Sequence, residues 1–273
     1  MKLISWNALH GMAIPPVQES GAEQALLRLE LAVKKLDVDL LGLQEIDHKQ
    51  SRSFHIHHVQ EVARSMESKY WAFAPTVIGT PGEKWHAVNK EESKIISPNK
   101  GSLSETAYGI GLVSRVPVMQ WHRIELGRSR IGLPLAVPSK RGVGLAYVRD
   151  EPRIALVAEL ENGFTVAVTH LSFVPILNFL QLRKLQRELS KFPGIPLVIG
   201  DLNLPWGLPE RTGWKSLANK LTYPAWSPKI QFDYLLLRKK DLSRVTIKPL
   251  AIKELGVSDH LPIGVEITEV KPK

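Results

Sequence analysis

The sequence predicts an α/β fold in which mixed β-sheets are flanked by helices. Apolar segments of strand length alternate along the chain with amphipathic segments of helix length, a pattern typical of sheets covered by helices. Several strand candidates follow one another closely, and Asn162-Gly163 between two of them is a strong signal for an antiparallel hairpin. No segment has the composition of a linker, so we expect residues 1–273 to form one domain.

Helices are expected where apolar residues recur with a period of three to four. Ser20 and Glu23 fit a capping box at the start of the first helix, and apolar side chains then recur at helical spacing as far as Leu36. The last helix mixes apolar residues with basic ones. The expected helices cover residues 20–36, 56–69 and 176–191.

Strands are indicated by continuous apolar runs and by alternation of apolar and polar residues. Phe164, Val166, Val168 and His170 share one face of their strand, because side chains alternate between its two faces. Residues 79–106 are rich in Gly, Pro, Ser and charge, so they are expected to form a long irregular insert. The expected strands cover residues 2–7, 38–46, 107–115, 117–126, 142–150, 152–160, 164–171, 195–201, 231–238, 244–250 and 261–267.

The composition favours a polyanionic partner. The chain carries 36 Lys and Arg against 27 Asp and Glu, a net charge of +9, which suits nucleic acid or other phosphates. It has no Cys, which excludes disulfides, thiolate metal sites and a cysteine nucleophile. No run approaches the roughly 20 apolar residues of a membrane span. Without a recognisable signal peptide, a cytoplasmic location and no stable membrane association are expected.

Polar side chains lie at the ends of several predicted strands, where a core would exclude them. Each alone could simply cap a turn, but open α/β sheets bind ligands beyond their strand ends. Carboxylates gathered at one edge repel one another, and a hard divalent cation such as Mg²⁺, Mn²⁺ or Ca²⁺ removes that conflict. The residues are Asn7, Glu45, His170, Asp201, Asn203, Asp233, Asp259 and His260.

Six short motifs carry these residues: SWN, GLQEID, VTHL, GDLN, FDYLLL and SDHLPI. A seventh motif, YGIGLVSRVPV, lies between the second and the third. The order and approximate spacing of the seven motifs between residues 2 and 267 resemble those of the endonuclease/exonuclease/phosphatase superfamily, which has the DNase I-like fold. The resemblance implies a four-layer α/β sandwich, in which helices flank two packed sheets and the site lies at one end. It also implies a phosphoester hydrolase that needs Mg²⁺ or Mn²⁺.

The same resemblance implies three residues at the metal. Glu45 would be the main ligand, and Asn7 would help to hold the metal or its water. Asp259 would bind the metal or support its ligands.

It further implies the residues that perform the chemistry. Asp201 would orient or deprotonate the attacking water, and Asn203 would contact the phosphate. His260, oriented by Asp233, would contact the scissile phosphate as a donor or acid/base group. His170 would donate to the phosphate or to the leaving group.

Two arginines and a histidine cluster are weaker candidates. Arg52, just after the GLQEID motif, and Arg153, at the start of a strand, could each reach the substrate phosphate. His55, His57 and His58 stand together, but they lack a second clean ligand pair and are interpreted as a solvated helix start rather than a zinc site.

Basic and aromatic residues could grip a polyanion. Arg128, Arg130, Lys140 and Arg141 lie in or beside the Gly/Pro-rich segment 127–144, which is interpreted as a loop. Either a polyanion-binding loop or ordinary exposed charge explains them.

Four tryptophans are near the expected site in sequence: Trp85, Trp206, Trp214 and Trp226. Each could stack on a base or pack in the core. Residues 171–182 are interpreted as a buried helix start in preference to a membrane-facing apolar finger.

Three functions fit the sequence. The first is a metal-dependent phosphodiesterase that acts on nucleic acid, which the basic charge favours. The second is hydrolysis of a phospholipid headgroup, an inositol phosphate or a nucleotide. The third is a non-catalytic phosphate-binding module, which the intact set of motif residues disfavours.

Overall fold

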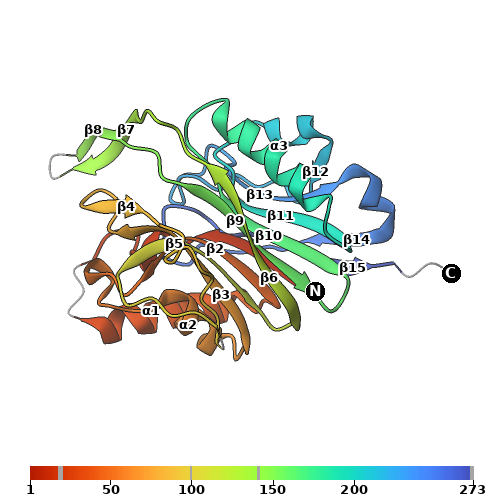
Figure 1. Cartoon of the computed structure of the whole chain (residues 1–273), viewed down its shortest axis with the longest axis horizontal. Coiled ribbons are helices and arrows are strands. Elements are labelled where there is room, and N and C mark those ends of the chain that lie inside the picture. Colours follow the sequence, from red (N-terminus) through yellow and green to blue (C-terminus); the bar gives the residue numbers. More distant parts are fainter. Residues whose placement is uncertain (18–20, 99, 140–141, 271–273) are drawn as a thin grey trace.

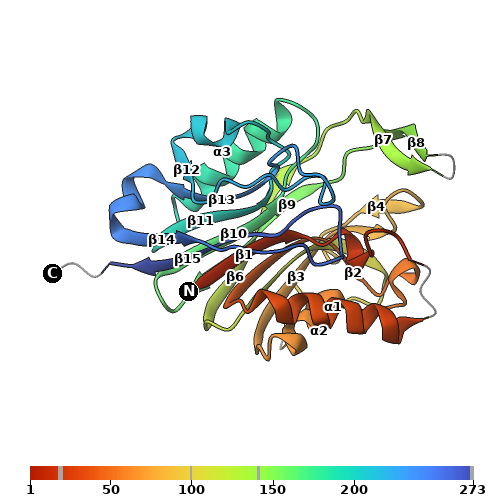
Figure 2. The same cartoon turned by 180° about the vertical axis from the view of Figure 1, so that it is seen from behind.

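The computed structural model describes residues 1–17, 21–98, 100–139 and 142–270. A seven-stranded and a six-stranded sheet pack face to face, with helices on their outer sides (Figure 1). The same layers are seen from behind in Figure 2. The expected α/β sandwich is therefore confirmed.

The seven-stranded sheet consists of β1 Lys2–Asn7, β2 Leu40–His48, β3 Tyr70–Gly79, β4 Trp85–Ala87, β5 Ala107–Ser114, β14 Val245–Pro249 and β15 Ile263–Glu269. Its order is β14-β15-β1-β2-β5-β3-β4. β1 and β2 are parallel, and the remaining neighbours are antiparallel. The sheet is thus mixed.

The six-stranded sheet consists of β6 Val118–Gly127, β9 Arg153–Leu160, β10 Phe164–His170, β11 Ile195–Asp201, β12 Trp214–Ser216 and β13 Asp233–Arg238. Its order is β12-β13-β11-β10-β9-β6, and only its β10–β11 pair is parallel. Between β6 and β9 the chain forms a separate antiparallel hairpin of β7 Leu133–Ser139 and β8 Gly142–Val148.

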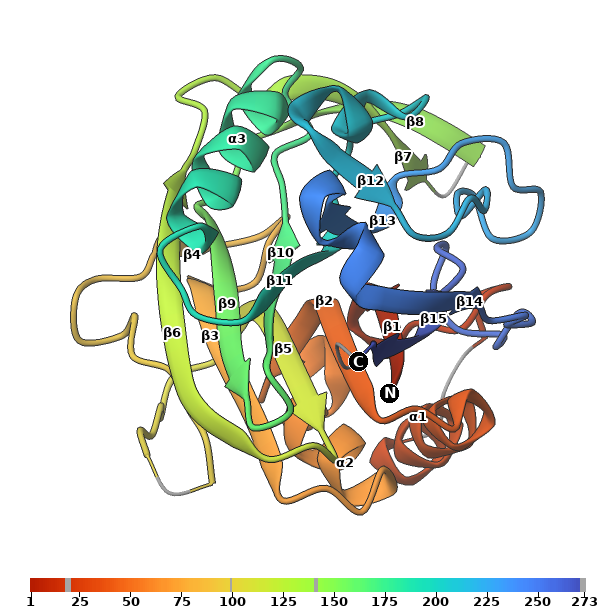
Figure 3. The same ribbon diagram turned by 90° about the vertical axis from the view of Figure 1, so that its right-hand side faces the viewer.

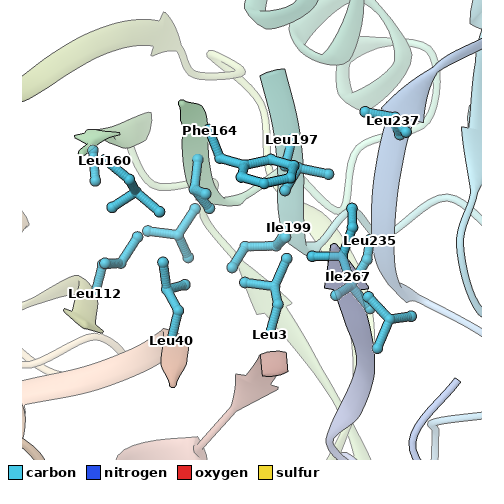
Figure 4. Packing of buried hydrophobic residues seen from close by; sticks show 14 of the residues in the cluster. Leu3, Leu40, Leu112, Leu160, Phe164, Leu197, Ile199, Leu235, Leu237 and Ile267 are labelled. Atoms are coloured by element: carbon cyan, nitrogen blue, oxygen red, sulfur yellow. The ribbon is translucent and has the colours of Figure 1, made fainter. Parts of the chain in front are cut away.

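The main core lies between the two sheets. Leu3, Leu40 and Leu112 of the seven-stranded sheet pack in one cluster with Leu197 and Ile199 of the other sheet (Figure 4). All five side chains are excluded from water. Burying one such side chain contributes roughly 1.5–3 kcal/mol, so the inner faces of the sheets are firmly joined.

Helices cover the outer face of each sheet. The long helices are α1 Ala22–Leu36, α2 His58–Ser65 and α3 Leu177–Leu189, and the short ones are η1 Leu9–Gly11, η2 Ser51–Ser53, η3 Leu208–Thr212 and η4 Lys239–Arg244. α1 and α2 pack on the seven-stranded sheet, and α3 packs on the six-stranded sheet (Figure 3). None of the helices in the described part of the chain has the length and apolarity needed to cross a membrane.

The predicted helix boundaries are only partly right. α1 begins at Ala22, and Ser20 lies outside the described residues. α2 is shorter than the expected helix over residues 56–69. Non-helical backbone bounds it, with ψ of 89° at His57 and φ of +53° at Glu67.

The sequence analysis missed some strands. No strand was predicted for residues 70–79, and 127–144 was interpreted as a loop although β7 lies there. The predicted strand over residues 142–150 is confirmed by β8. The insert 79–106 also contains the short strand β4. We call the β7–β8 hairpin the β7–β8 arm. The prolines of β7 obscured its strand pattern in the sequence, but a two-stranded sheet has only edge strands, where proline is tolerated.

The close approach of β10 to β11 at Gly200 explains why a glycine stands directly before Asp201. Gly200 has a φ of +148°, and a Cβ there would lie 1.8 Å from the carbonyl oxygen of Thr169 on the paired strand β10. Only glycine therefore permits the close approach that places Asp201 opposite His170.

We expect Gly200→Ala to lower the free energy of unfolding by about 3 kcal/mol, because the backbone clash forces β10 and β11 apart. Chemical denaturation measures this, with Gly21→Ala as control, because a Cβ at Gly21 meets nothing within 4 Å and the backbone there is extended. Equal stability of the two variants would contradict this reading of the strand pair.

Candidate active site

Four polar side chains lie on the inner faces of the two sheets, just beyond the last apolar residues of the core. They are Asn7, His170, Asp201 and Asp233. Apolar residues of the same strands, two or four positions away, belong to the core between the sheets, so side-chain alternation directs all four into the same interlayer space. β1 runs toward the end of the molecule from which β4 and the β7–β8 arm project (Figures 1 and 2).

Glu45 reaches this space through an irregularity in β2. The register between β2 and β5 shifts between Leu43 and Ile46, and Glu45 has a φ of +54°. A bulge of this kind re-aims a side chain, and such backbone strain is commonly kept at functional sites.

Asn7 joins two of the carboxylates. Its Nδ2 donates to Glu45 Oε1 at 2.9 Å and to Asp201 Oδ2 at 3.1 Å. The backbone N–H of Leu9 donates to Asn7 Oδ1 at 3.2 Å, which fixes the amide with its NH₂ group toward the acids. Asn7 therefore bridges the two sheets and positions both carboxylates.

His170 faces the same pair. Its Nε2 lies 3.6 Å from Asp201 Oδ2 and 4.0 Å from Glu45 Oε1. Burial lowers the pKa of His170 well below its usual value, so the ring is neutral. A neutral imidazole suits a metal ligand better than a proton donor.

His260 and Asp233 form the hydrogen-bonded pair that the sequence predicts. The Nδ1 of His260 lies 2.8 Å from Asp233 Oδ2, and its Nε2 lies 3.7 Å from Asp201 Oδ2. Ser258 supports the pair, because its hydroxyl donates to the carbonyl of Asn7 at 2.6 Å and accepts from the N–H of His260.

The site perturbs the acid–base properties of these groups. Burial raises the pKa of Glu45 and raises that of Asp201 to about 7. Burial alone would lower the pKa of His260, but the charges of Asp233 and Asp201 outweigh it and raise that pKa to about 10. His260 is therefore protonated at neutral pH and can donate a hydrogen bond to an anion.

Asn203 closes the site on the α3 side. Its N–H donates to Asp201 Oδ1 at 3.0 Å, and its Nδ2 donates to the carbonyl of Leu171 at 3.0 Å. The side chain of Asn178 in turn donates to the Asn203 carbonyl at 2.8 Å. Asn203 has a φ of +50°, which turns the chain directly after Asp201.

The donor set suits a divalent cation. Ligand atoms of Glu45, His170 and Asp201 lie within 4.8 Å of one another, and so do those of Asp201, Asp233 and His260. Burial disfavours the charged form of Glu45 and Asp201, and a cation would restore it. Oxygen donors with one imidazole are compatible with Mn²⁺, and the carboxylates with Mg²⁺.

Asp259 stands beside this set. It belongs to neither group of potential ligands among the described residues. Its charge nevertheless raises the pKa of Glu45, although burial raises that pKa more. Its Oδ1 is buried without a hydrogen-bond partner. The carboxylate is thus close enough to interact electrostatically and retains an unused acceptor.

Arg153 lies at the start of β9 and is 4% exposed. It donates to Asp150 Oδ1 at 3.1 Å and 3.2 Å, and its Nη1 lies 3.9 Å from Glu151 Oε2. Burial raises the pKa of Glu151 to about 7. Neither acid was predicted as a site residue, although Asp150 and Glu151 stand three and two positions before Arg153 in the chain.

Arg52 is held by an acid that also escaped notice. Its guanidinium makes two bonds to Asp47, at 2.8 Å and 2.9 Å, and stands 5.6 Å from the ring centre of Tyr108. Asp47 is part of the GLQEID motif, two residues after Glu45, and this was the available signal. Its bonds to Asp47 orient Arg52.

The histidine cluster is not a solvated helix start. His58 is 4% exposed, and its Nδ1 accepts from the N–H of Asp47 at 3.1 Å. The ring of His57 packs against His48 and Phe73, with centroids 4.5 Å and 5.8 Å apart. Only His55 is exposed, so the prediction was wrong for the other two.

The other basic and aromatic candidates differ in exposure and in contacts. Lys140 and Arg141 lie outside the described residues. Trp214 is buried in the core, whereas Trp206 and Trp226 are 82% and 61% exposed. Arg149 lies over the ring of Trp85 at 5.3 Å, which connects the end of β8 to β4.

Residues 171–182 are not simply a buried helix start. Ile176 precedes α3 and is 76% exposed, and Leu180 is 56% exposed. The opposite faces of the same segment carry the buried Leu171 and Leu182.

The sequence profile of the Endonuclease/Exonuclease/phosphatase family matches residues 4–260. The chain belongs to this family. Its members are typically phosphoester hydrolases that use a divalent metal. No curated protein sequence matches the chain.

Solved structures share the fold. An endonuclease/exonuclease/phosphatase from Beutenbergia cavernae gives a TM-score of 0.60 at 14% identity, over 98% of this chain and 71% of that one. A mannosyl-6-phosphatase of Bacteroides thetaiotaomicron gives 0.59 at 11% identity, over 98% and 99%. The catalytic domain of human Nocturnin with bound sulfate gives 0.57 at 16% identity, over 99% and 94%.

Burial of His58 makes stability depend on pH. Burial lowers the pKa of this ring from 6.5 to about 4. Between these values the unfolded chain binds a proton that the folded protein does not, so the free energy of unfolding decreases as the pH falls through this window.

We expect wild type to lose about 2 kcal/mol more than His58→Asn between about pH 7.5 and about pH 5, because asparagine offers an acceptor but does not titrate. Denaturant unfolding at both pH values measures the difference. Equal losses would show that His58 is protonated in the folded protein.

Proposed function

We propose that the protein is a Mg²⁺- or Mn²⁺-dependent phosphodiesterase that hydrolyses nucleic acid by in-line attack of water. One observation carries the proposal: an acid from one sheet meets an acid and an imidazole from the other in one interlayer space, where ligand atoms of Glu45, His170 and Asp201 lie within 4.8 Å of one another. The contributing residues extend from Asn7 to His260, so we also propose that the chain acts as one catalytic unit.

The geometry supports a division of roles. Glu45 and His170 would hold the cation, which when bound neutralises charge on the phosphate. Asp201, fixed by Asn7 and by the N–H of Asn203, would orient the water and accept its proton.

The phosphate side of the site carries the positive groups. Protonated His260, fixed by Asp233, would donate from Nε2 to the phosphate or to the leaving oxygen. Arg153 would add positive charge, because its charge lowers the pKa of both Glu45 and His170 and is therefore felt inside the site. We propose that Asn203 and Asp259 support these groups from either side.

A substrate panel with and without metal tests the proposal. We expect Glu45→Gln to lower kcat on the accepted phosphodiester by about 10³-fold or more, because metal stabilisation of the transition state supplies several kcal/mol. Glu159→Gln is the matched control: this partly buried strand glutamate pairs with His122 at 2.5 Å near the other end of β9.

The panel comprises single-stranded DNA, RNA, an inositol phosphate, a mannose 6-phosphate, phospholipid vesicles and a nucleotide, each with Mg²⁺, Mn²⁺ or EDTA. Undiminished turnover by Glu45→Gln, or no turnover of any substrate by wild type, would refute the proposed activity. Hydrolysis of the phospholipid, the inositol phosphate or the nucleotide, with neither nucleic acid cleaved, would assign the second function instead.

Salt separates nucleic acid from small substrates. If about three phosphates contact the protein, kcat/KM on a single-stranded oligonucleotide should fall about tenfold or more from 50 to 200 mM salt, because counterions are released on binding. A small phosphodiester such as bis(p-nitrophenyl) phosphate should respond far less. Parallel salt curves for both substrates would contradict a nucleic-acid substrate.

A further inference from the structure

Three large apolar side chains are exposed beside the site. They are Ile176, at 76%, and Leu180, at 56%, on α3 and its N-cap, and Trp206, at 82%, in the segment after β11. Trp206 is the most exposed of the large apolar residues in the described chain.

Two hydrogen bonds hold the Trp206 segment along α3. Asn178 Nδ2 donates to the Asn203 carbonyl at 2.8 Å, and Gln186 Nε2 donates to Thr212 Oγ1 at 2.8 Å. Trp206 lies between these two connections, so its segment and the helix form one continuous surface.

The surface is joined directly to the proposed catalytic groups. Asn203 bonds to Asp201 through its N–H. Trp206 is three residues further on, so its Cα lies within about 11 Å of that of Asn203 even if the chain is fully extended. The indole is therefore within reach of a strand whose phosphate is bound at Asp201.

The backbone holds the indole outward at an energetic cost. Trp206 has a φ of +54°, a region that bulky residues avoid. The N–H of Gly207 donates to the hydroxyl of Tyr234 at 3.3 Å, and the N–H of Leu208 donates to the Pro205 carbonyl at 3.1 Å. Strain of this kind at an exposed residue indicates a function outside the core.

Positive charge accompanies the apolar residues. Arg183 and Arg187 are exposed on α3 at helical spacing from Ile176 and Leu180, and Arg211 is exposed in η3. Nucleic acid fits this surface, because its bases stack on an indole and its phosphates pair with guanidinium groups. A membrane would instead require a contiguous apolar area, which these arginines interrupt.

We propose that a single strand of nucleic acid leaves the site along α3 and η3, with an unpaired base stacked on Trp206. This inference rests on the proposed function. Trp206 acts as a positioning and specificity-determining residue: it selects a substrate that carries an unpaired base near the scissile phosphate.

The test compares Trp206→Ala and Trp206→Phe on two single-stranded oligonucleotides, one with normal bases and one with tetrahydrofuran abasic residues throughout. We expect Trp206→Ala to lower kcat/KM on the normal strand by about 5- to 150-fold, the range that base stacking supplies. Phe should restore most of it, and on the abasic strand both variants should equal wild type. Met119→Ala is the control, since Met119 is 65% exposed and lies at the end of β6 away from Arg153.

The outcomes separate this inference from the proposed function. If wild type cleaves the oligonucleotide and Trp206→Ala does so equally well, the stacking role is wrong and the activity stands. If wild type hydrolyses no phosphoester, the proposed function is wrong and the stacking role, which rests on it, is overturned as well. Trp206-dependent binding to anionic phospholipid vesicles, without an effect on the oligonucleotide, would replace the nucleic-acid strand with a membrane and overturn the inference.

Discussion

The site depends on one electrostatic constraint: acids that repel one another are held together where water is largely excluded. Burial raises the pKa of both Glu45 and Asp201, so neither charge is stable there without compensation. Asn7 donates to both, and His260 faces Asp201 and Asp233 with a positive charge. A divalent cation, which members of this family generally use, would complete this compensation.

The packed sandwich holds these acids together despite their repulsion. The apolar faces of the two sheets fix the positions of their strands, and the polar side chains simply extend the same inward rows at one end. The remaining adjustments are local backbone departures, with positive φ at Glu45, Asn203 and Ser258. Each costs of order 1–3 kcal/mol and persists only because the surrounding core over-determines it.

Much of this could be read from the sequence, and the reasons differ by residue. Strand periodicity is a local signal, and it placed His170 on the same face as Phe164 and Val168, which the structure shows to be the inner one. The pairing of Asp233 with His260 followed from the resemblance to the family. The acceptor role of Asp47 toward Arg52 depends on how the chain turns through η2 after β2, which residue types alone do not specify. The β7–β8 arm has prolines that conceal its alternation. Burial also depends on tertiary packing, which no local pattern contains.

The most direct measurement is an anomalous diffraction map from crystals grown with Mn²⁺. We expect one strong peak in contact with the carboxylate of Glu45 and within coordinating distance of His170 or Asp201, and we expect it to vanish in Glu45→Gln crystals. A peak elsewhere, or none at millimolar Mn²⁺, would contradict the view that these buried acids are assembled to hold a cation.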